Sequence, residues 1–304
     1  MQTNGRYYQA YSLGFTEPWF QGRPTPVGFG LSFSRYGSGG YLSRFTGSAD
    51  QDAGGLVTAS ARVFYDQRLK WPDDKFNSST SLRYQYYQND DLFTTIPSGV
   101  TQFMTIQQAF SRNSQDHPYF PQTGSQALLS AEVAPPLPGF AQYHKWRFRT
   151  NWNVPVIPKV TLSAGTDFGF VGSLTGDRVS FERFIVGGSP FDTQGFYNQF
   201  GRDIVYMRGY PVSSIGPRQS DEAVGGTILN KYTSELRWMA IQSPQLQAAP
   251  YLFMDAANTW NSFSSYNPVQ LYRSAGVGMR LFLPIIGMLE LTYGYNFDEF
   301  VPLR

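Results

Sequence analysis

The sequence predicts an all-β protein, an antiparallel transmembrane β-barrel, and three observations support this fold class. The chain has 304 residues, of which 17% are aromatic and only 15% charged, and its mean hydropathy is −0.33. A chain that is hydrophilic on average yet rich in Tyr and Phe fits strands with one face in lipid and the other in water. The other two observations are a period-two alternation of side chains and a regular alternation of short turns with longer loops.

Composition also excludes several classes of protein. No segment approaches the roughly 20 apolar residues that a membrane-spanning helix requires. The net charge of +2 indicates no polyanionic partner. The net charge by itself says nothing about nucleic acid, which is not among the expected partners. Residues 1–6 are polar and show no secretory signal. If the protein is exported, we expect the chain to lack its beginning.

Twelve strands and no helix are predicted from the alternating segments and the Gly-rich and Pro-rich stretches between them. In chain order the expected strands are residues 6–15, 27–34, 56–69, 80–88, 100–110, 126–134, 143–152, 160–171, 227–241, 247–260, 271–283 and 288–297.

The connections between these strands alternate in kind. Short turns are expected at residues 21–26, 71–79, 153–159, 242–245 and 284–287, and mostly longer loops lie between them. Outer-membrane barrels show this asymmetry, with short periplasmic turns and long extracellular loops. One end of the sheet is therefore predicted to carry the short turns and the other end the longer loops.

Side chains sort by face along the strands. In the last strand the predicted outer set is apolar and the inner set is polar: Leu289, Leu291, Tyr293, Tyr295 and Phe297 against Glu290, Thr292, Gly294, Asn296 and Asp298. In residues 160–171 the sets are Leu162, Ala164, Phe168 and Phe170 against Thr161, Ser163, Gly165 and Asp167. A soluble sandwich or propeller is the alternative, although no repeat of blade length is present.

The long loop at residues 172–222 carries the segment Tyr206-Met207-Arg208-Gly209-Tyr210. A loop of this length in a compact domain suggests a tip that packs inside the protein. A buried arginine must be paired, because an unpaired buried charge is very costly. Glu235 and Asp255 occupy inward positions of the following strands, and either carboxylate could accept a bidentate contact from Arg208.

The remaining polar residues predict neither catalysis nor a metal site. The only histidines, His117 and His144, have no Ser and acid at a recognisable spacing, so a solvated or interfacial role is expected for both. The chain has no Cys, and transition metals are not expected. The pairs 73–74 and 90–91 are Asp-Asp and are interpreted as turn residues, with a calcium site as the alternative.

Glycines and aromatic residues complete the list of candidates. Gly187 and Gly188 either let the loop backbone approach the wall of the lumen, the space inside the barrel, or end a strand. Aromatic residues near the strand ends are expected to anchor the protein at the membrane surfaces: Trp19, Phe20, Trp71, Tyr119, Trp146 and Trp152.

Six segments occur in an order that resembles one family. They are Phe15-Thr16-Glu17-Pro18-Trp19-Phe20, the turn from Arg112-Asn113-Ser114 to Pro121, Phe184-Ile185-Val186-Gly187-Gly188, Met207-Arg208-Gly209-Tyr210, Asp221-Glu222-Ala223-Val224-Gly225-Gly226 and Asp255-Ala256-Ala257-Asn258-Thr259-Trp260. Together they resemble the barrel domain of the BamA family of outer-membrane protein assembly factors. In that family the tip of the sixth extracellular loop folds back into the lumen, and the resemblance implies that Arg208 meets Glu235 and Asp255 there.

The resemblance also implies that strands are missing. The family has a sixteen-stranded barrel preceded by periplasmic POTRA domains. Aligned on the loop motif, the chain is expected to be one partial barrel domain, residues 1–304, lacking the first three strands, the last strand and all POTRA domains. We therefore expect the sheet to stay open or to close badly between its first and last strands.

The function implied by the resemblance is assembly of outer-membrane β-barrel proteins. The protein would be integral to the outer membrane of a Gram-negative cell and would accept the strands of unfolded outer-membrane proteins at its seam. It would need no ATP, no cofactor and no catalytic residue. Accessory assembly lipoproteins are expected partners through the missing POTRA domains. A two-partner-secretion or autotransporter-assembly transporter of the same superfamily is the alternative, and an outer-membrane phospholipase lacks the residues it would need.

Overall fold

A computed structural model of the chain describes residues 2–4, 8–37, 55–90, 97–176, 182–189, 202–219 and 222–299. Regular structure in these residues is almost entirely β-strand, and the one helical element is a single 3-10 turn, η1 (Phe20–Gly22). In the described part of the chain, no helix combines the length and apolar character needed to span a membrane.

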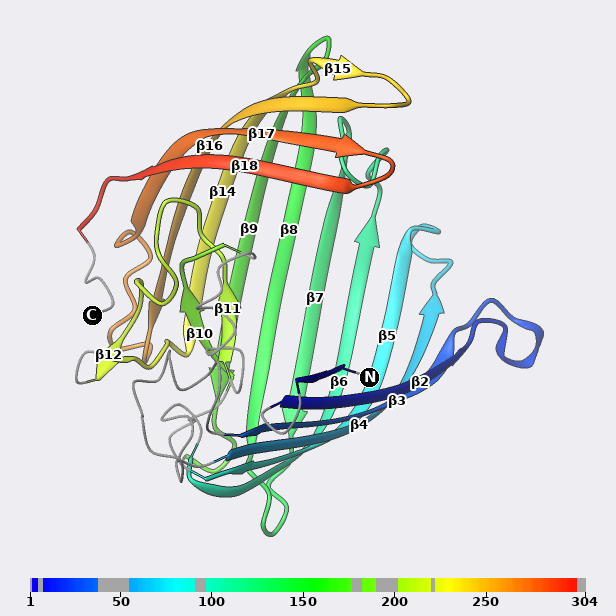
Figure 1. The fold of residues 1–304 in the computed structure, drawn as a ribbon, viewed down its shortest axis with the longest axis vertical. Helices are drawn as coiled ribbons and strands as arrows, with labels where there is room; N and C mark the ends of the chain where they lie inside the picture. The colour runs from blue at the N-terminus through cyan, green and yellow to red at the C-terminus, as the bar shows by residue number, and fades with distance from the viewer. Residues whose placement is uncertain are drawn as a thin grey trace. The chain divides into compact units, whose positions relative to one another are not determined.

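All twelve predicted strands are present, so the all-β fold class is confirmed (Figure 1). They are β2 (Tyr8–Glu17), β3 (Val27–Gly37), β4 (Gly55–Arg68), β5 (Phe76–Asn89), β6 (Gly99–Asn113), β7 (Gly124–Ala134), β8 (Tyr143–Ile157), β9 (Val160–Gly172), β14 (Ile228–Trp238), β16 (Gln247–Trp260), β17 (Tyr272–Leu283) and β18 (Gly287–Asn296). The sheet also contains two short strands that the sequence does not signal, β1 (Gln2–Asn4) and β15 (Ile241–Gln242).

The strands follow one another through the sheet in chain order, from β1 to β18, with the loop segment between β9 and β14 left out. The ladders with a described register within this sheet, such as β17 with β18, are antiparallel. Among the described residues, no ladder joins residues 6–15 to residues 288–297, so the expectation of an open sheet is confirmed.

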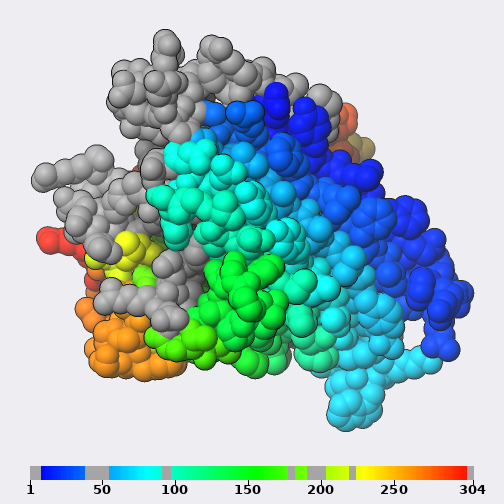
Figure 2. Space-filling view, turned by 90° about the horizontal axis from the view of Figure 1, so that it is seen from below, coloured from blue at the N-terminus to red at the C-terminus, as the bar shows by residue number. Residues whose placement is uncertain are grey.

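The chain divides into two compact units. One unit consists of Met1–Phe110, Ser130–Lys145 and Gly172–Phe181, and the other of Ser111–Leu129, Trp146–Val171 and Glu182–Arg304. The surface of the first unit passes from blue to cyan in chain order, as expected where each strand pairs with the next (Figure 2). The candidate site described below lies in the second unit.

Strand β8 is longer than predicted, and the expected turn at residues 153–159 is wrong in its extent. The strand continues to Ile157: Asn153 is its last buried residue, and the residues from Val154 to Ile157 are all exposed. The turn is reduced to residues 158–159, where Lys159 has a positive φ of 66°. Pro155 misled the prediction, because a proline inside a strand usually signals a break or an edge.

The side chains sort by face as the alternation predicts. We call the face that carries the buried positions the inner face and the opposite one the outer face. In β18 the apolar set is exposed: Leu289, Leu291, Tyr293 and Tyr295. In β9, Thr161 and Ser163 are buried on the inner face and Leu162 is exposed. Burial of polar side chains with exposure of apolar ones is the reverse of a soluble barrel.

The loop between β9 and β14 contains four short strands: β10 (Arg183–Val186), β11 (Arg202–Val205), β12 (Arg218–Gln219) and β13 (Glu222–Ala223). They lie off the path of the sheet (Figure 1). Most of the stretch from Ser189 to Val205 lies outside the described residues, as do Asp91 and Asp221.

Candidate functional site

The backbone of the loop builds a platform for its tip. Strands β10 and β11 pair in parallel, which brings Val186 opposite Val205. Beyond that pair, the Gly188 amide donates to the Tyr210 carbonyl at 2.7 Å, and the Met207 amide donates to the Gly188 carbonyl at 3.2 Å. The tip is therefore fixed at both sides of Arg208 by backbone hydrogen bonds.

Two glycines make this platform possible. Gly187 and Gly188 have φ of +122° and +80°, values that residues with a Cβ rarely adopt. A Cβ on Gly187 would lie 2.0 Å from the Pro211 carbonyl oxygen, and one on Gly188 would lie 2.1 Å from Val212 Cγ2. The structure places both glycines directly after β10, against the returning part of their own loop.

The Arg208 guanidinium lies between two carboxylates on the inner face. It donates to both oxygens of Asp255 on β16, from Nε at 2.8 Å and from Nη2 at 2.6 Å. Its Nη1 donates to Glu235 on β14 at 3.0 Å. Asp255 and Glu235 are both buried, so these ion pairs are screened much less than pairs on an exposed surface. The tip thereby ties the loop to two neighbouring strands.

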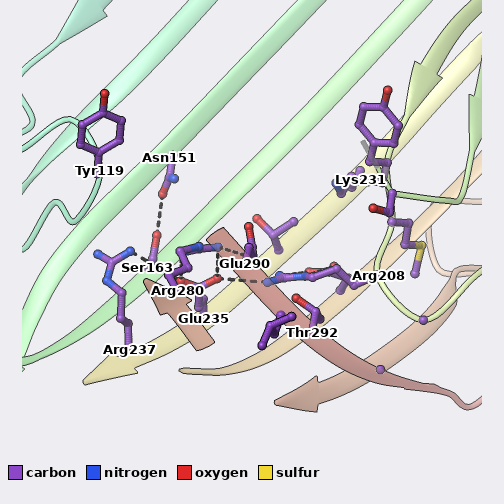
Figure 3. A pocket seen from close by; sticks show the side chains of 18 of the residues that line it. Tyr119, Asn151, Ser163, Arg208, Lys231, Glu235, Arg237, Arg280, Glu290 and Thr292 are labelled. Atoms are coloured by element: carbon purple, nitrogen blue, oxygen red, sulfur yellow. Dashed lines mark hydrogen bonds and ion pairs between the residues drawn. The ribbon is translucent and has the colours of Figure 1, made fainter. Parts of the chain in front are cut away.

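Glu235 is shared with two further arginines that the sequence does not single out. Arg280 on β17 donates to Glu235 from both terminal nitrogens, at 2.5 and 2.9 Å, and contacts Glu290 at 3.2 Å. Arg237 lies 3.5 Å from Glu235. Figure 3 shows Arg208 and Arg280 converging on Glu235 from different elements. One carboxylate therefore joins three guanidinium groups.

Aromatic rings complete the surroundings of these cations. The Arg208 Cζ lies 3.9 Å from the ring centroid of Phe253, and the Arg280 Cζ lies 4.6 Å from that of Tyr251. The Tyr251 hydroxyl in turn donates to Glu290 at 2.5 Å. A guanidinium over a ring face gains a cation–π attraction that grows as water is removed.

The rest of the tip packs on the last two strands of the sheet. The Ser274 hydroxyl donates to the Arg208 carbonyl at 2.6 Å. A Cβ on Gly294 would lie only 2.9 Å from the Gly209 backbone, so the two glycines allow the tip and β18 to approach closely. The Tyr210 hydroxyl donates to the Arg273 carbonyl at 3.0 Å. Through these contacts the tip spans β14, β16, β17 and β18.

The charge of the tip is stabilised where it lies. Burial opposes the charge of the Arg208 guanidinium, but the hydrogen bonds and charges of Asp255 and Glu235 outweigh it and hold the pKa of Arg208 above its ordinary value. The tip therefore keeps its positive charge at any physiological pH.

A second ion cluster holds the base of the loop. Arg147 on β8 donates to Asp167 on β9, from Nε at 2.9 Å and from Nη2 at 2.6 Å, and its Nη1 donates to Asp203 on β11. The Arg147 guanidinium also lies over the ring of Phe184 on β10. In addition, Lys231 donates to the Tyr206 carbonyl at 2.5 Å. None of these contacts was predicted from the sequence.

A cavity of about 950 Å³ opens beside the tip. Its lining combines the tip residues, the ion network around Glu235 and the turn between β6 and β7. Tyr119, Asn151 and Ser163 line it on the side away from Arg208 (Figure 3).

Other residues considered from the sequence lie elsewhere. His117 lies half-buried in the turn between β6 and β7, where its Nδ1 accepts the amides of Tyr119 and Phe120 at 3.1 and 3.0 Å. Its solvated or interfacial role stays a prediction. Tyr119 lines the cavity and stacks on Phe282, and its role as an interfacial anchor stays a prediction. Asp73 accepts the Lys75 amide within its turn. In the described residues, no group of three or more His, Cys, Asp or Glu could hold a metal ion.

One signal in the sequence could have found Arg280 and Arg237. Both lie on the parity of their strands that carries inner-face residues, as does Glu235, and charged residues on an inner face must find partners. Parity alone does not say which partner each one takes, since that depends on how the strands are staggered.

Comparison with known proteins places this geometry in context. The family model described as the Omp85 superfamily domain matches residues 1–300. Among solved structures, the chain is similar to BamA from Haemophilus ducreyi lacking POTRA domains 1–3, with a TM-score of 0.70 and 19% identity over 96% of this chain and 59% of that one.

Two further similar structures are CdiB proteins. CdiB from Escherichia coli matches with a TM-score of 0.61 and 14% identity, over 97% of this chain and 50% of that one. CdiB from Acinetobacter baumannii matches with a TM-score of 0.54 and 12% identity, over 96% and 47%. The chain thus spans about half to three-fifths of the length of these proteins, and at such identities the likeness concerns the fold.

Proposed function

The chain belongs to the Omp85 superfamily, and from that premise we propose that it forms part of a factor that assembles and inserts β-barrel proteins in the outer membrane. The observation that carries the proposal is the docked tip, in which Arg208 bridges Asp255 and Glu235 while Gly209 lies against Gly294. This arrangement fixes four strands with respect to one another from their inner face.

The proposed mechanism uses backbone groups and needs no catalytic residue. A strand whose edge is unpaired offers N–H and C=O groups that can template an incoming strand. In a complete barrel, the seam between the first and last strands would supply that edge. If the strands span less than the thickness of the bilayer, the surrounding lipid would thin locally to match them. This thinning would lower the barrier to insertion of a substrate barrel. The tip would act as a brace that keeps β14 to β18 in register while a substrate strand pairs.

The location and the partners belong to the same proposal. The exposed apolar outer face of β18 fits the hydrocarbon of an outer-membrane bilayer, in which the protein would be integral. Unfolded outer-membrane proteins would be the substrates, and accessory assembly lipoproteins would bind through POTRA domains outside the matched region.

Reconstitution of the intact protein in liposomes tests the proposal. We expect the protein to accelerate folding of a urea-denatured outer-membrane protein without nucleotide, measured as heat-modifiable mobility on gels. We expect Arg208→Ala to lose most of this acceleration, because the buried Asp255 loses its bidentate partner and the tip loses its tie to β14 and β16, and Arg208→Lys to keep part of it. Arg68→Ala is the matched control, since Arg68 pairs with Asp74 on an exposed surface.

The two parts of the proposal fail separately. If the parent protein does not accelerate folding, the assembly function is wrong. If the parent is active and Arg208→Ala is equally active, with unchanged heat-modifiability, then the tip is not a brace.

A second candidate function is favoured by the cavity. A polar cavity of about 950 Å³ beside the tip suits a transporter that passes an extended chain, as in two-partner secretion or autotransporter assembly. Expression of the intact protein with a candidate exported partner distinguishes the two functions. Release of the partner into the medium, with no effect on folding of other barrels, would support transport.

A further inference from the structure

The inner face of the second unit carries a small patch of apolar side chains, which we call the apolar plate. It consists of Met239, which directly follows β14, and of Ala249, Phe282 and Met288, from the ends of β16, β17 and β18 nearest the tight turns. Nearby charged residues on the inner face include Glu235, two inner-face positions from Met239, and Arg280, one inner-face position from Phe282. An apolar patch on a water-facing wall has to be covered if it is to be stable.

The turn between β6 and β7, residues 114–123, covers this plate. Phe120 is 1% exposed and forms one buried cluster with Met239 and Ala249. The ring of Tyr119 stacks on that of Phe282, with centroids 4.8 Å apart and planes inclined by 23°. Phe282 is also the ladder partner of Met288 in the hairpin that joins β17 to β18. The turn thus rests on the last hairpin of the described sheet.

The turn is held in this shape by its own hydrogen bonds. The His117 Nδ1 accepts the amides of Tyr119 and Phe120. These two hydrogen bonds hold the backbone of both aromatic residues. Asp116 accepts the amides of Gln122 and Thr123 at 2.9 and 3.1 Å. Such contacts restrict the backbone of the turn, and a restricted turn loses less conformational entropy when Phe120 docks on the plate.

A polar contact connects the turn to the loop tip. Arg237 donates from Nη2 to the Pro121 carbonyl and lies 3.5 Å from Glu235 through Nη1. Glu235 in turn accepts Arg208. The tip from one end of the sheet and the turn from the other therefore meet through two side chains.

We propose that the β6–β7 turn is a latch, which closes the tight-turn end of the cavity and clamps the β17–β18 hairpin by seating Phe120 and Tyr119 on the apolar plate. Opening of the latch uncovers the plate and frees the hairpin, and the Arg237–Glu235 contact couples this opening to the docked tip. The latch goes beyond the proposed function, because it holds for an assembly factor and for a transporter alike.

Thiol labelling of the intact protein tests the latch, since this chain contains no cysteine. Ala249→Cys places a thiol in the plate, and Ala257→Cys places one on the same strand near its other end; both alanines are 0% exposed. We expect Phe120→Ala to raise the maleimide labelling rate at position 249 by at least about tenfold and to leave position 257 unchanged, as for a local opening.

Either other pattern overturns the latch. If both thiols react faster, Phe120 stabilises the fold in general and not a separate closure. If neither does, the turn does not shield the plate. Tyr293→Ala, which removes an exposed outer-face ring from β18, is the control and should leave both rates unchanged.

A second pair of variants tests how the latch is held. His117→Ala removes the acceptor of two amides and should raise labelling at position 249, whereas His117→Asn should restore slow labelling. Asn113, the last residue of β6, accepts the Gln115 amide at the start of this turn, so an asparagine already serves as acceptor of a backbone amide beside it. Equal labelling rates in the two variants would contradict the role given to His117.

Hydrogen exchange tests the clamp on the hairpin. In Phe120→Ala we expect the β18 amides that pair with β17 to exchange at least about tenfold faster, while those of β14 that pair with β9 keep their rates. Unchanged exchange in β18 would show that the turn covers the plate without clamping the hairpin.

Discussion

At the scale of single residues, Glu235 organises the site. It accepts Arg208 and Arg280 and lies beside Arg237, so one carboxylate balances three cations in a poorly solvated place. Arg280 has a second acid in Glu290, whereas the described ion pairs of Arg237 involve Glu235 alone. Loss of Glu235 leaves like charges close together with little water between them.

We therefore expect Glu235→Gln to lower the free energy of unfolding by roughly 3–5 kcal/mol, the cost of breaking a buried ion pair from one side. Urea unfolding in detergent micelles, followed by tryptophan fluorescence, measures this change. Asp74→Asn is the control, because the Arg68–Asp74 pair is exposed and such pairs contribute only about 0–1 kcal/mol. A loss in Glu235→Gln no larger than in the control would show that the network is not stabilising.

At the scale of elements, the loop depends on backbone conformations that glycine alone adopts easily. Gly187 and Gly188 turn the chain directly after β10 and lie against the segment that follows the tip. The position of Arg208 therefore depends on the loop backbone. A change in that backbone would displace the guanidinium from Asp255 and Glu235.

Two glycines with similar backbone conformations allow the cost of backbone strain to be separated from the cost of a steric clash when each is replaced by alanine. Gly188 and Gly139 have nearly equal φ, +80° and +78°, but a Cβ would collide with Val212 at Gly188 and meet nothing within 4 Å at Gly139. We expect Gly139→Ala to cost about 1 kcal/mol of strain, and Gly188→Ala to cost at least roughly 2 kcal/mol more. Urea midpoints of the two variants measure the difference, and equal midpoints would contradict the close packing at Gly188.

At the scale of the whole molecule, the outer face carries the apolar side chains that a membrane protein presents to lipid. Leu252 lies in the middle of β16 and is 56% exposed, and Ile285 lies at the tip of the β17–β18 hairpin and is 99% exposed. Both side chains are aliphatic and exposed, but only Leu252 would lie deep in the hydrocarbon of a bilayer.

We expect Leu252→Arg to destabilise the protein in lipid by about 2–4 kcal/mol, and Ile285→Arg by about 0–1 kcal/mol, because the cost of a charge depends on its depth. Unfolding in liposomes of defined thickness gives both values. Equal costs at the two positions would contradict a membrane-spanning orientation of β16.

The sequence by itself determines the strands and their faces. Alternation places Leu289, Leu291 and Tyr293 on one side of β18 and Glu290 on the other, and the ladder confirms it. The physical reason is local: successive side chains of a strand point to opposite faces, so the order of residues is sufficient. Where local chemistry misleads, as at Pro155 in β8, the predicted strand ends too early.

Only the tertiary structure decides which groups meet across the sheet. Arg208 and its two acids are suggested by the sequence, but the roles of Arg280 and Arg237 depend on the stagger between strands, which no single strand encodes. The turn that seats Phe120 on the apolar plate is a stronger case, since its contacts join residues more than 100 positions apart. Such contacts form because two surfaces are complementary in shape and polarity, and that property exists only once the chain has folded.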